Sequence, residues 1–350
     1  HALFTTELLH DLQERRILIE DANGQWIASP HLDWQTLPAR VEGVIARRIG
    51  RLDARLRETL TIASVEGEEF TAEVVARVQS LDERQLVQVL GSELDRRHHL
   101  VRAQEIRPLG ARRLSLYRFR HHLFQKYLYD SLDPAERAYL HETVGATLEN
   151  LHHEQPEQLA LIAAQLARHF QAAGLAEKAI DYRLLAGQQA VKVSANQEAL
   201  THFQAGLALL NDLPDTPERA RRELNLQVAL GVPVTAMRGY AHPDVELVYT
   251  RARALCVQLG DVAQLFPALY GLWRMVMIRG QLRAAQTLSD ELMDLARSAQ
   301  DTELLLEACR ATGSTALHLG ELILARMLLE QGLALYDRQQ HAAHAFLYGH

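Results

Sequence analysis

Residues 116–132 read LYRFRHHLFQKYLYDSL and separate two parts of the chain that have different sequence patterns. Before this stretch, helical patterns alternate with short strand-like segments, and the sequence is locally basic. After it, apolar residues recur at helical spacing in one segment after another. The stretch contains neither Gly nor Pro, so we expect its strand-like beginning to run into a helix without a flexible linker. It therefore predicts a domain boundary, and we expect domains at 1–35, 36–132 and 133–350.

The composition is that of a mainly α-helical globular protein. Of the 350 residues, 48% are hydrophobic and 23% are charged, and Leu, Ala, Arg, Glu and Gln are abundant. The net charge of −7 argues against wholesale nucleic-acid binding. No apolar run approaches the ~20 residues that span a bilayer. We therefore expect a cytoplasmic protein without membrane contact, in which Cys256 and Cys309 are reduced.

Residues 36–132 follow the order of a winged-helix domain. Three helical patterns are followed by two strand-like segments that flank Pro108-Leu109-Gly110, which predicts three helices and a β-hairpin. A further hairpin is expected around Asn23-Gly24, because these residues tolerate the positive φ of a tight turn. The predicted helices cover 5–16, 37–66, 70–78 and 82–97, and the predicted wing strands cover 99–103 and 114–119.

Residues 133–350 contain an internal repeat of about 40 residues. A four-residue template with helical spacing recurs, with small residues where neighbouring helices would approach closely. One helix pair of this size cannot bury its apolar face alone, so the copies are expected to stack into an α-α superhelical solenoid. The copies are Ala199/His202/Gly206/Leu209, Val245/Val248/Ala252/Leu255, Ala285/Leu288/Leu292/Leu295 and Ala325/Leu328/Gly332/Leu335. We also expect Pro233 and Pro267 to start or kink helices.

The order of these parts resembles the C-terminal half of bacterial STAND-class (AAA-like) signalling ATPases, regulators often fused to adenylate/guanylate cyclase, kinase or LuxR-type output domains. Four segments carry the likeness: HALFTTELL at the start, LPARVEGVIARRIGRLD with LTIASVEGEEF, YRFRHHLFQKYLYDSL, and HFQAAGLAEKAIDYRLLAG. The resemblance implies that residues 1–35 end the ATPase module. It also implies a winged helix at 36–132 and a tetratricopeptide-like (TPR-like) solenoid at 133–350 that is truncated at its C-terminal end.

The sequence contains no phosphate-binding GxxxxGK[ST] loop. We therefore expect this chain not to be an enzyme and to hold no nucleotide cofactor, with ATP or ADP and Mg bound by the upstream module. No histidine stands with Cys or carboxylates at metal-ligand spacing, so we also expect no metal site. The resemblance implies a regulatory and scaffold role. The winged helix would couple the nucleotide state of the ATPase module in cis to the solenoid, which would bind a protein partner or a small-molecule inducer.

The motif F-R-H places Arg120 and His121 in the segment that joins the wing to the next helix. By resemblance, a winged-helix histidine of this kind contacts the nucleotide phosphates, so His121 with Arg120 is a candidate nucleotide sensor. The alternative is a structural histidine that packs the wing against the next helix.

The region from Gly91 to Lys126 is basic, with nine positive and three negative side chains. Such a patch can bind DNA phosphates or dock the ATPase module. The third predicted helix, ERQLVQVLGSELDRR, carries acidic and apolar residues where base contacts would come from, so the sequence favours docking over DNA. The candidate residues are Arg96, Arg97, Arg112, Arg113 and Arg118.

In the solenoid, Tyr270, Trp273, Arg274 and Met277 lie at helical spacing. Aromatic residues with arginine are typical of interaction hot spots and also of a core between repeats. We expect Trp273 in the core and Tyr270, Arg274 and Arg310 on a surface that contacts the partner.

Overall fold

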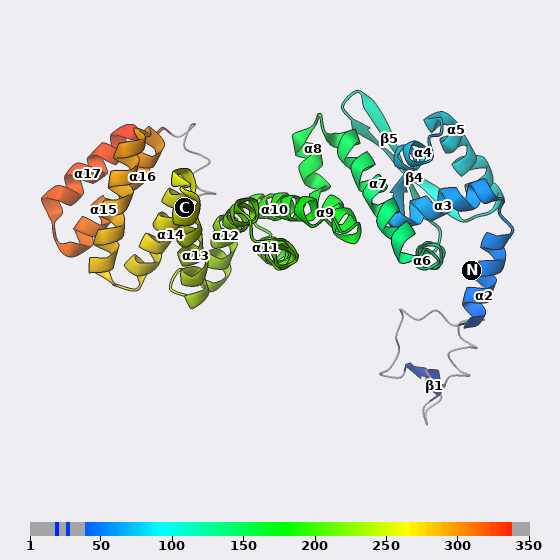
Figure 1. Cartoon of the computed structure of the whole chain (residues 1–350), viewed down its shortest axis with the longest axis horizontal. Coiled ribbons are helices and arrows are strands. Elements are labelled where there is room, and N and C mark those ends of the chain that lie inside the picture. Colours follow the sequence, from blue (N-terminus) through cyan, green and yellow to red (C-terminus); the bar gives the residue numbers. More distant parts are fainter. Residues whose placement is uncertain (1–17, 21–25, 29–38, 338–350) are drawn as a thin grey trace. The chain divides into compact units, whose positions relative to one another are not determined.

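The computed structural model describes residues 18–20, 26–28 and 39–337 and is mainly helical (Figure 1). The chain divides into two compact units, unit 1 at 1–155 and unit 2 at 156–350. In the first segment, β1 (Leu18–Glu20) and β2 (Trp26–Ala28) pair antiparallel, as the predicted hairpin requires. The predicted helix at 5–16 and the Asn23-Gly24 turn lie outside the described residues.

Unit 1 places helices around a three-stranded antiparallel sheet. Its strand order is β3-β5-β4, so the last strand along the chain occupies the centre. The elements are α2 (Ala39–Gly50), α3 (Ala54–Glu66), β3 (Glu69–Thr71), α4 (Ala72–Val78), α5 (Glu83–Val89), a π-helical segment (Leu90–Arg97), β4 (Val101–Leu109), β5 (Arg112–Phe119), α6 (His122–Asp130) and α7 (Pro134–His152).

Three of these elements differ from the predicted ones. The single helix predicted at 37–66 is broken, because the Asp53 carboxylate accepts a hydrogen bond from the backbone N–H of Leu56 (2.8 Å) and caps a new helix, α3. Strand β3 lies where a helix was predicted to begin, and Phe70 pairs with Tyr117 of β5. The hairpin is longer than predicted and turns at Gly110, whose φ is +57°.

Helix α7 packs against α3 and α4, so it belongs to unit 1. The solenoid was expected to begin at residue 133. In the structure, unit 2 instead begins at Pro156, and the difference arises because the α7 residues Val144 and Leu148 are buried within unit 1.

Unit 2 consists of consecutive antiparallel helices. The first helices of successive pairs (α10, α12, α14 and α16) contact one another directly, and the surface that they form is called here the first-helix face. The helices are α8 (Pro156–Leu161), α9 (Ala163–Ala172), α10 (Ala176–Lys192), α11 (Asn196–Leu209), α12 (Pro217–Arg238), α13 (Pro243–Leu259), α14 (Val262–Ile278), α15 (Leu282–Ala299), α16 (Thr302–Leu319) and α17 (Leu322–Leu335). A 3₁₀ turn (Leu210–Asp212) follows α11.

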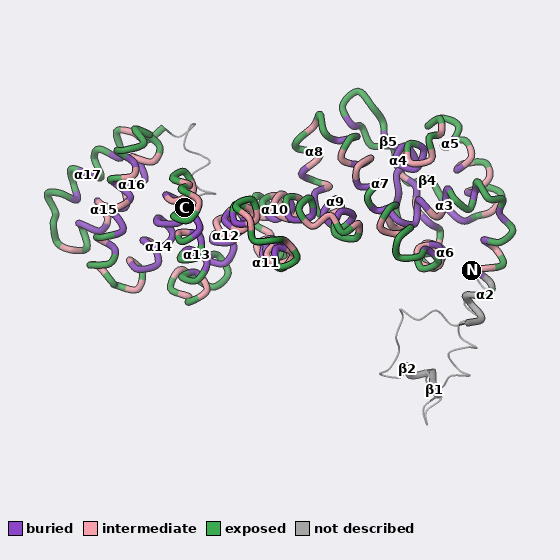
Figure 2. Tube along the Cα trace, viewed as in Figure 1, coloured by how far each residue is buried: buried purple, intermediate pink, exposed green. Residues whose placement is uncertain are grey.

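The predicted repeat is present, because the four template copies lie in the second helices α11, α13, α15 and α17. The first template position is buried in each copy, with at most 2% of the residue exposed (Ala199, Val245, Ala285 and Ala325). Figure 2 shows buried residues along the faces that neighbouring helices of unit 2 turn toward each other. The TPR-like stacking of helix pairs therefore follows from this buried template.

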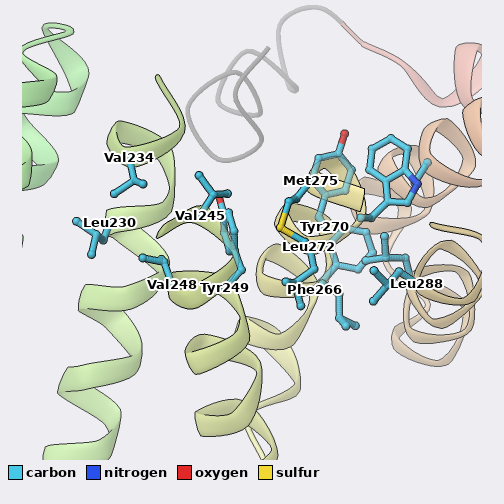
Figure 3. Close-up of a cluster of buried hydrophobic side chains, with 14 of the residues drawn as sticks. Leu230, Val234, Val245, Val248, Tyr249, Phe266, Tyr270, Leu272, Met275 and Leu288 are labelled. Carbon is cyan, nitrogen blue, oxygen red and sulfur yellow. The ribbon is translucent and has the colours of Figure 1, made fainter. Parts of the chain in front are cut away.

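Glycines allow close approach between the helices of unit 2. A Cβ atom on Gly231 of α12 would lie 2.5 Å from Cζ of Tyr249, and one on Gly271 of α14 would lie 2.3 Å from the same atom. The Tyr249 ring of α13 therefore packs against the backbones of two first helices, within the core that Figure 3 shows.

Pro233 and Pro267 lie inside continuous helices, so neither starts a helix, and a kink at each proline stays a prediction. None of the helices in the described part of the chain is both long and apolar enough to cross a membrane.

Candidate functional site

Three of the solenoid residues singled out from the sequence form a cluster with Tyr240 and Glu307: Tyr270 and Arg274 lie on α14, and Arg310 lies on α16. The guanidinium carbon of Arg274 lies 4.1 Å from the ring centroid of Tyr240, and that of Arg310 lies 5.3 Å from the ring centroid of Tyr270. Glu307 of α16 pairs with Arg310. We call these five residues the Arg–Tyr cluster, and its geometry is that of two cation–π pairs in adjacent repeats.

Local sequence explains the assembly of the cluster. Tyr270 and Arg274 are four residues apart on α14, so they lie one helical turn apart on the same side. Arg310 reaches Tyr270 because α16 is the neighbouring first helix. Sequence reasoning did not find Tyr240, which lies beyond the end of α12 in a segment without a periodic pattern. The three-residue spacing of Glu307 and Arg310 could have indicated that pair.

Tyr270 does not lie on the partner surface where it was expected. It is only 1% exposed, and its ring centroid lies 5.1 Å from that of Trp273 and 6.4 Å from that of Phe266 (Figure 3). The residue belongs to the core because α14 has helices packed on both sides. The expected core position of Trp273 is confirmed, since it is 5% exposed and its indole N–H donates to Oγ1 of Thr315 (2.9 Å).

Arg310 carries a partly desolvated positive charge. Its Nε donates to Oε2 of Glu307 (3.1 Å), a residue that is only 3% exposed. Burial lowers the pKa of Arg310 to about 10, and the nearby Tyr240 opposes this shift. The guanidinium group is therefore still protonated at neutral pH. Its Nη2 is buried and has no hydrogen-bond partner among the residues that the structure describes.

His121 lies in the two-residue joint between β5 and α6. Its Nδ1 accepts a hydrogen bond from the backbone N–H of Leu123 (3.2 Å), so the side chain caps α6. Burial and the stacked ring of His122 lower the pKa of His121, while Glu68 raises it. His121 therefore has a structural contact in this joint, as a structural histidine would. The nucleotide-sensing role stays a prediction.

Arg120, the other residue of the proposed sensor, contacts unit 1 itself. Its Nη2 pairs with Oδ1 of Asp95 (2.5 Å), and its Nε donates to the backbone carbonyl of Val101 (3.1 Å). These contacts tie the end of β5 to the π-helical segment and to β4. A role in contacting nucleotide stays a prediction for Arg120 as well.

The predicted basic patch divides into paired and unpaired arginines. Arg97 pairs with Glu93 (2.9 Å) and Arg118 pairs with Glu68 (2.7 Å). The other three, Arg96, Arg112 and Arg113, are exposed and form no ion pair with another described residue. Among the five candidate arginines of this patch, these three therefore carry charges that no described carboxylate compensates.

Within the described ranges, no three His, Cys, Asp or Glu side chains come close enough to hold a metal ion. Cys256 and Cys309 are buried free thiols. Burial raises the pKa of both thiols, that of Cys256 to about 11, so both are protonated and weakly nucleophilic at neutral pH.

No protein-family model matches the chain. An uncharacterized protein from Rhizobium meliloti (strain 1021) is 24% identical over 229 residues, which are 64% of this chain and 21% of that protein. The chain thus spans about a fifth of the length of that relative.

Two solved structures show a loose likeness to the chain. BtubC (BKLC) from P. vanneervenii has a TM-score of 0.45 and 13% identity, covering 58% of this chain and 82% of its own. A STAND protein with a tetratricopeptide repeat sensor from Pyrococcus horikoshii has a TM-score of 0.34 and 12% identity, covering 92% of this chain and 48% of its own. Both TM-scores lie below 0.5, so neither likeness supports a conclusion about this chain.

Proposed function

We propose that this chain is a non-catalytic sensor and scaffold segment of a STAND-type signalling ATPase. In this proposal unit 1 is a winged helix, with α3, α4 and α5 followed by the β4–β5 hairpin, and unit 2 is a TPR-like sensor. The order of motifs along the sequence supports the assignment. The observation that carries it is the Arg–Tyr cluster, because it places two guanidinium groups in adjacent repeats of unit 2.

The cluster is suited to an acidic group on a protein partner or an inducer. Guanidinium groups bind carboxylates and phosphates through paired hydrogen bonds, and stacking on tyrosine limits the rotamers of the arginine side chains. Arg310 also has a buried Nη2 that lacks a partner among the described residues. Arginine and tyrosine together are enriched at the centres of interaction sites.

Unit 1 would relay the state of an upstream ATPase module that docks in cis. Only Arg120 and His121 separate β5 from α6, and the Gln125 amide of α6 donates to the backbone carbonyl of Ser64 in α3 (2.7 Å). A displacement of the wing would therefore move α6 and α3 with it. ATP or ADP with Mg would bind in the upstream module, with His121 and Arg120 facing it, in a cytoplasmic protein.

Two observations on the full-length protein test this proposal. The complete reading frame should encode a GxxxxGK[ST] loop ahead of residue 1, and a frame without it would remove the ATPase assignment. In the full-length protein, Arg274→Ala and Arg310→Ala should abolish the change in ADP retention that the partner or inducer causes. Arg326→Ala is the matched control, because that arginine is 80% exposed on α17 and pairs only locally with Glu330. An unchanged response in the cluster variants would contradict the proposal.

A second candidate function, DNA binding by the wing, is favoured by Arg112 and Arg113. Both are exposed and form no ion pair with another described residue. This alternative predicts duplex binding that weakens steeply with salt and is lost in the variant with both residues changed to alanine. Arg55→Ala on α3, also exposed, should bind as the unchanged protein does. Equal binding by all three proteins would exclude Arg112 and Arg113 of the wing as the DNA contact.

A further inference from the structure

A cavity of about 820 Å³ lies in unit 2, between α10, α12 and α14 of the first-helix face. Phe203 of α11 lines it and is fully buried, and a Cβ on Gly187 would lie 2.3 Å from that ring, so the ring position is fixed. The volume is within the range of about 300–1,000 Å³ that small-ligand sites occupy. The other apolar lining residues are Leu184, Val191, Val228, Ala229, Val232 and Pro267.

The charge on the lining of the cavity is positive. Lys192 is the charged residue that lines it, and no carboxylate does. The Lys192 ammonium forms no ion pair with another described residue, so an anion could occupy this position without displacing an internal partner. Three amide side chains, Gln188, Asn225 and Gln264, complete the lining. An anionic ligand is therefore favoured over a cationic one.

The lining of the cavity extends along α10 and has its charge at one end of that helix. On α10 its lining runs from Leu184 to Lys192, which is about 12 Å along the helix at 1.5 Å per residue. Lys192 is the last residue of α10, so the ammonium lies at the C-terminal end of this wall. Apolar residues of α10 and α12 line most of the remaining length, together with the amides Gln188 and Asn225.

We propose that this cavity binds an amphiphilic carboxylate, a linear acyl chain that ends in an anionic head group. The chain would lie against Val191, Val228 and Val232, and the carboxylate would pair with Lys192. An extended peptide would bring an N–H and a C=O for every residue, and each needs a partner when it is buried. Three amides and one ammonium cannot satisfy several such pairs, whereas an acyl chain brings none.

The inference rests on the proposed function in one respect, because it takes the acyl carboxylate to be the inducer of unit 2. Binding can nevertheless be measured without any ATPase. We suggest isothermal titration calorimetry of the full 350-residue chain with monomeric dodecanoate. We expect one molecule to bind per chain. In Lys192→Gln the affinity should fall about tenfold, through loss of the charge-assisted contact. Lys178→Gln should bind as the unchanged protein does, because Lys178 is also on α10 but does not line the cavity.

Filling the cavity is the second arm of the test. Ala229→Trp should abolish dodecanoate binding. If circular dichroism shows that this variant is unfolded, Val232→Phe is used in its place, with the same expected result. Dodecan-1-ol has the same chain without the charge, so it should bind the unchanged protein more weakly than dodecanoate does. Its affinity should be the same for the unchanged protein and for Lys192→Gln.

Three results would overturn the inference. The first is no binding of dodecanoate, and the second is equal binding by the filled variant. The third is binding of a short apolar peptide with a free carboxyl end where dodecanoate does not bind. If dodecanoate binds as expected but leaves ADP retention of the full-length protein unchanged, the ligand site stands and its role as the inducer site of unit 2 fails.

Discussion

Replacing Gly271 with alanine tests the close approach of helices on which unit 2 depends. The new Cβ would lie 2.3 Å from Cζ of Tyr249, whereas ordinary Cβ contacts begin at 3.4 Å. The ring and the α14 backbone would therefore have to separate by about 1.1 Å, the difference between these two distances. The ring cannot simply swing toward α12, because Gly231 approaches the same ring there.

The expected magnitude follows from two opposing effects. Overpacking a core costs about 1–3 kcal/mol, and alanine is about 1 kcal/mol better than glycine within a helix. Because Tyr249 is held by two helices, we expect the upper part of the range and a net loss of about 1–2 kcal/mol. For a unit of this size, that lowers the Tm of its transition by about 2–8 °C.

Differential scanning calorimetry of a set of four variants provides the measurement. Gly43→Ala is the control, because Gly43 is exposed in α2 and no described atom lies within 4 Å of its Cβ position, so it should lose no stability. Gly271→Ala should stabilise the chain by up to about 1 kcal/mol once Tyr249→Ala has removed the ring. If Gly271→Ala has the same effect with and without the ring, the clash is not the cause.

Two other changes have defined outcomes. His202 is buried, and Nη1 of Arg183 lies 3.2 Å from its Nδ1. Burial and this positive charge lower the pKa of His202 below 6.5, so on acidification the histidine takes up its proton in the unfolded chain before it does in the folded one. Stability should therefore fall as the pH is lowered from about 7 to about 5, and His202→Gln should flatten that dependence in thermal melts at a series of pH values, whereas an unaltered slope would refute this cause. Thr315→Val removes the acceptor of the buried Trp273 N–H and should cost about 1–3 kcal/mol in calorimetry, whereas the exposed Thr287→Val should change little. Equal losses in the two valine variants would exclude the hydrogen bond as the source.

Much of the helical architecture was readable in the sequence, because periodic patterns and caps are local. One helix was predicted to begin at residue 82, and the Asp82 carboxylate caps it by accepting a hydrogen bond from the Gln85 backbone N–H (2.9 Å). Strand β3 was missed because its three residues are too few to show alternation. It forms by pairing with β5, in which Tyr117 is the partner of Phe70. The position of α7 was also missed, since a helical pattern does not indicate which unit the helix packs against.

The candidate site was predictable to a similar extent. Arg274 and Arg310 were predicted on one partner surface, and the structure places them on α14 and α16, two first helices that contact each other. Their role in partner binding stays a prediction. The burial of Tyr270 was not predictable, because helical spacing shows which residues share a face but not which neighbours cover it. The cavity beside Lys192 combines residues of four helices, and no local pattern marks it.

The strand order of unit 1 has a consequence for the order of events during synthesis. Strand β5 lies at the centre of the sheet, yet it leaves the ribosome after β3 and β4, which are not paired with each other. Neither of the earlier strands has a partner in the sheet until β5 begins to emerge at Arg112, so the sheet can form only after that point. The helix pairs of unit 2 can instead form one after another as each is completed. A nascent chain stalled before Arg112 should therefore expose two strand edges to chaperones, whereas a chain stalled between repeats should not.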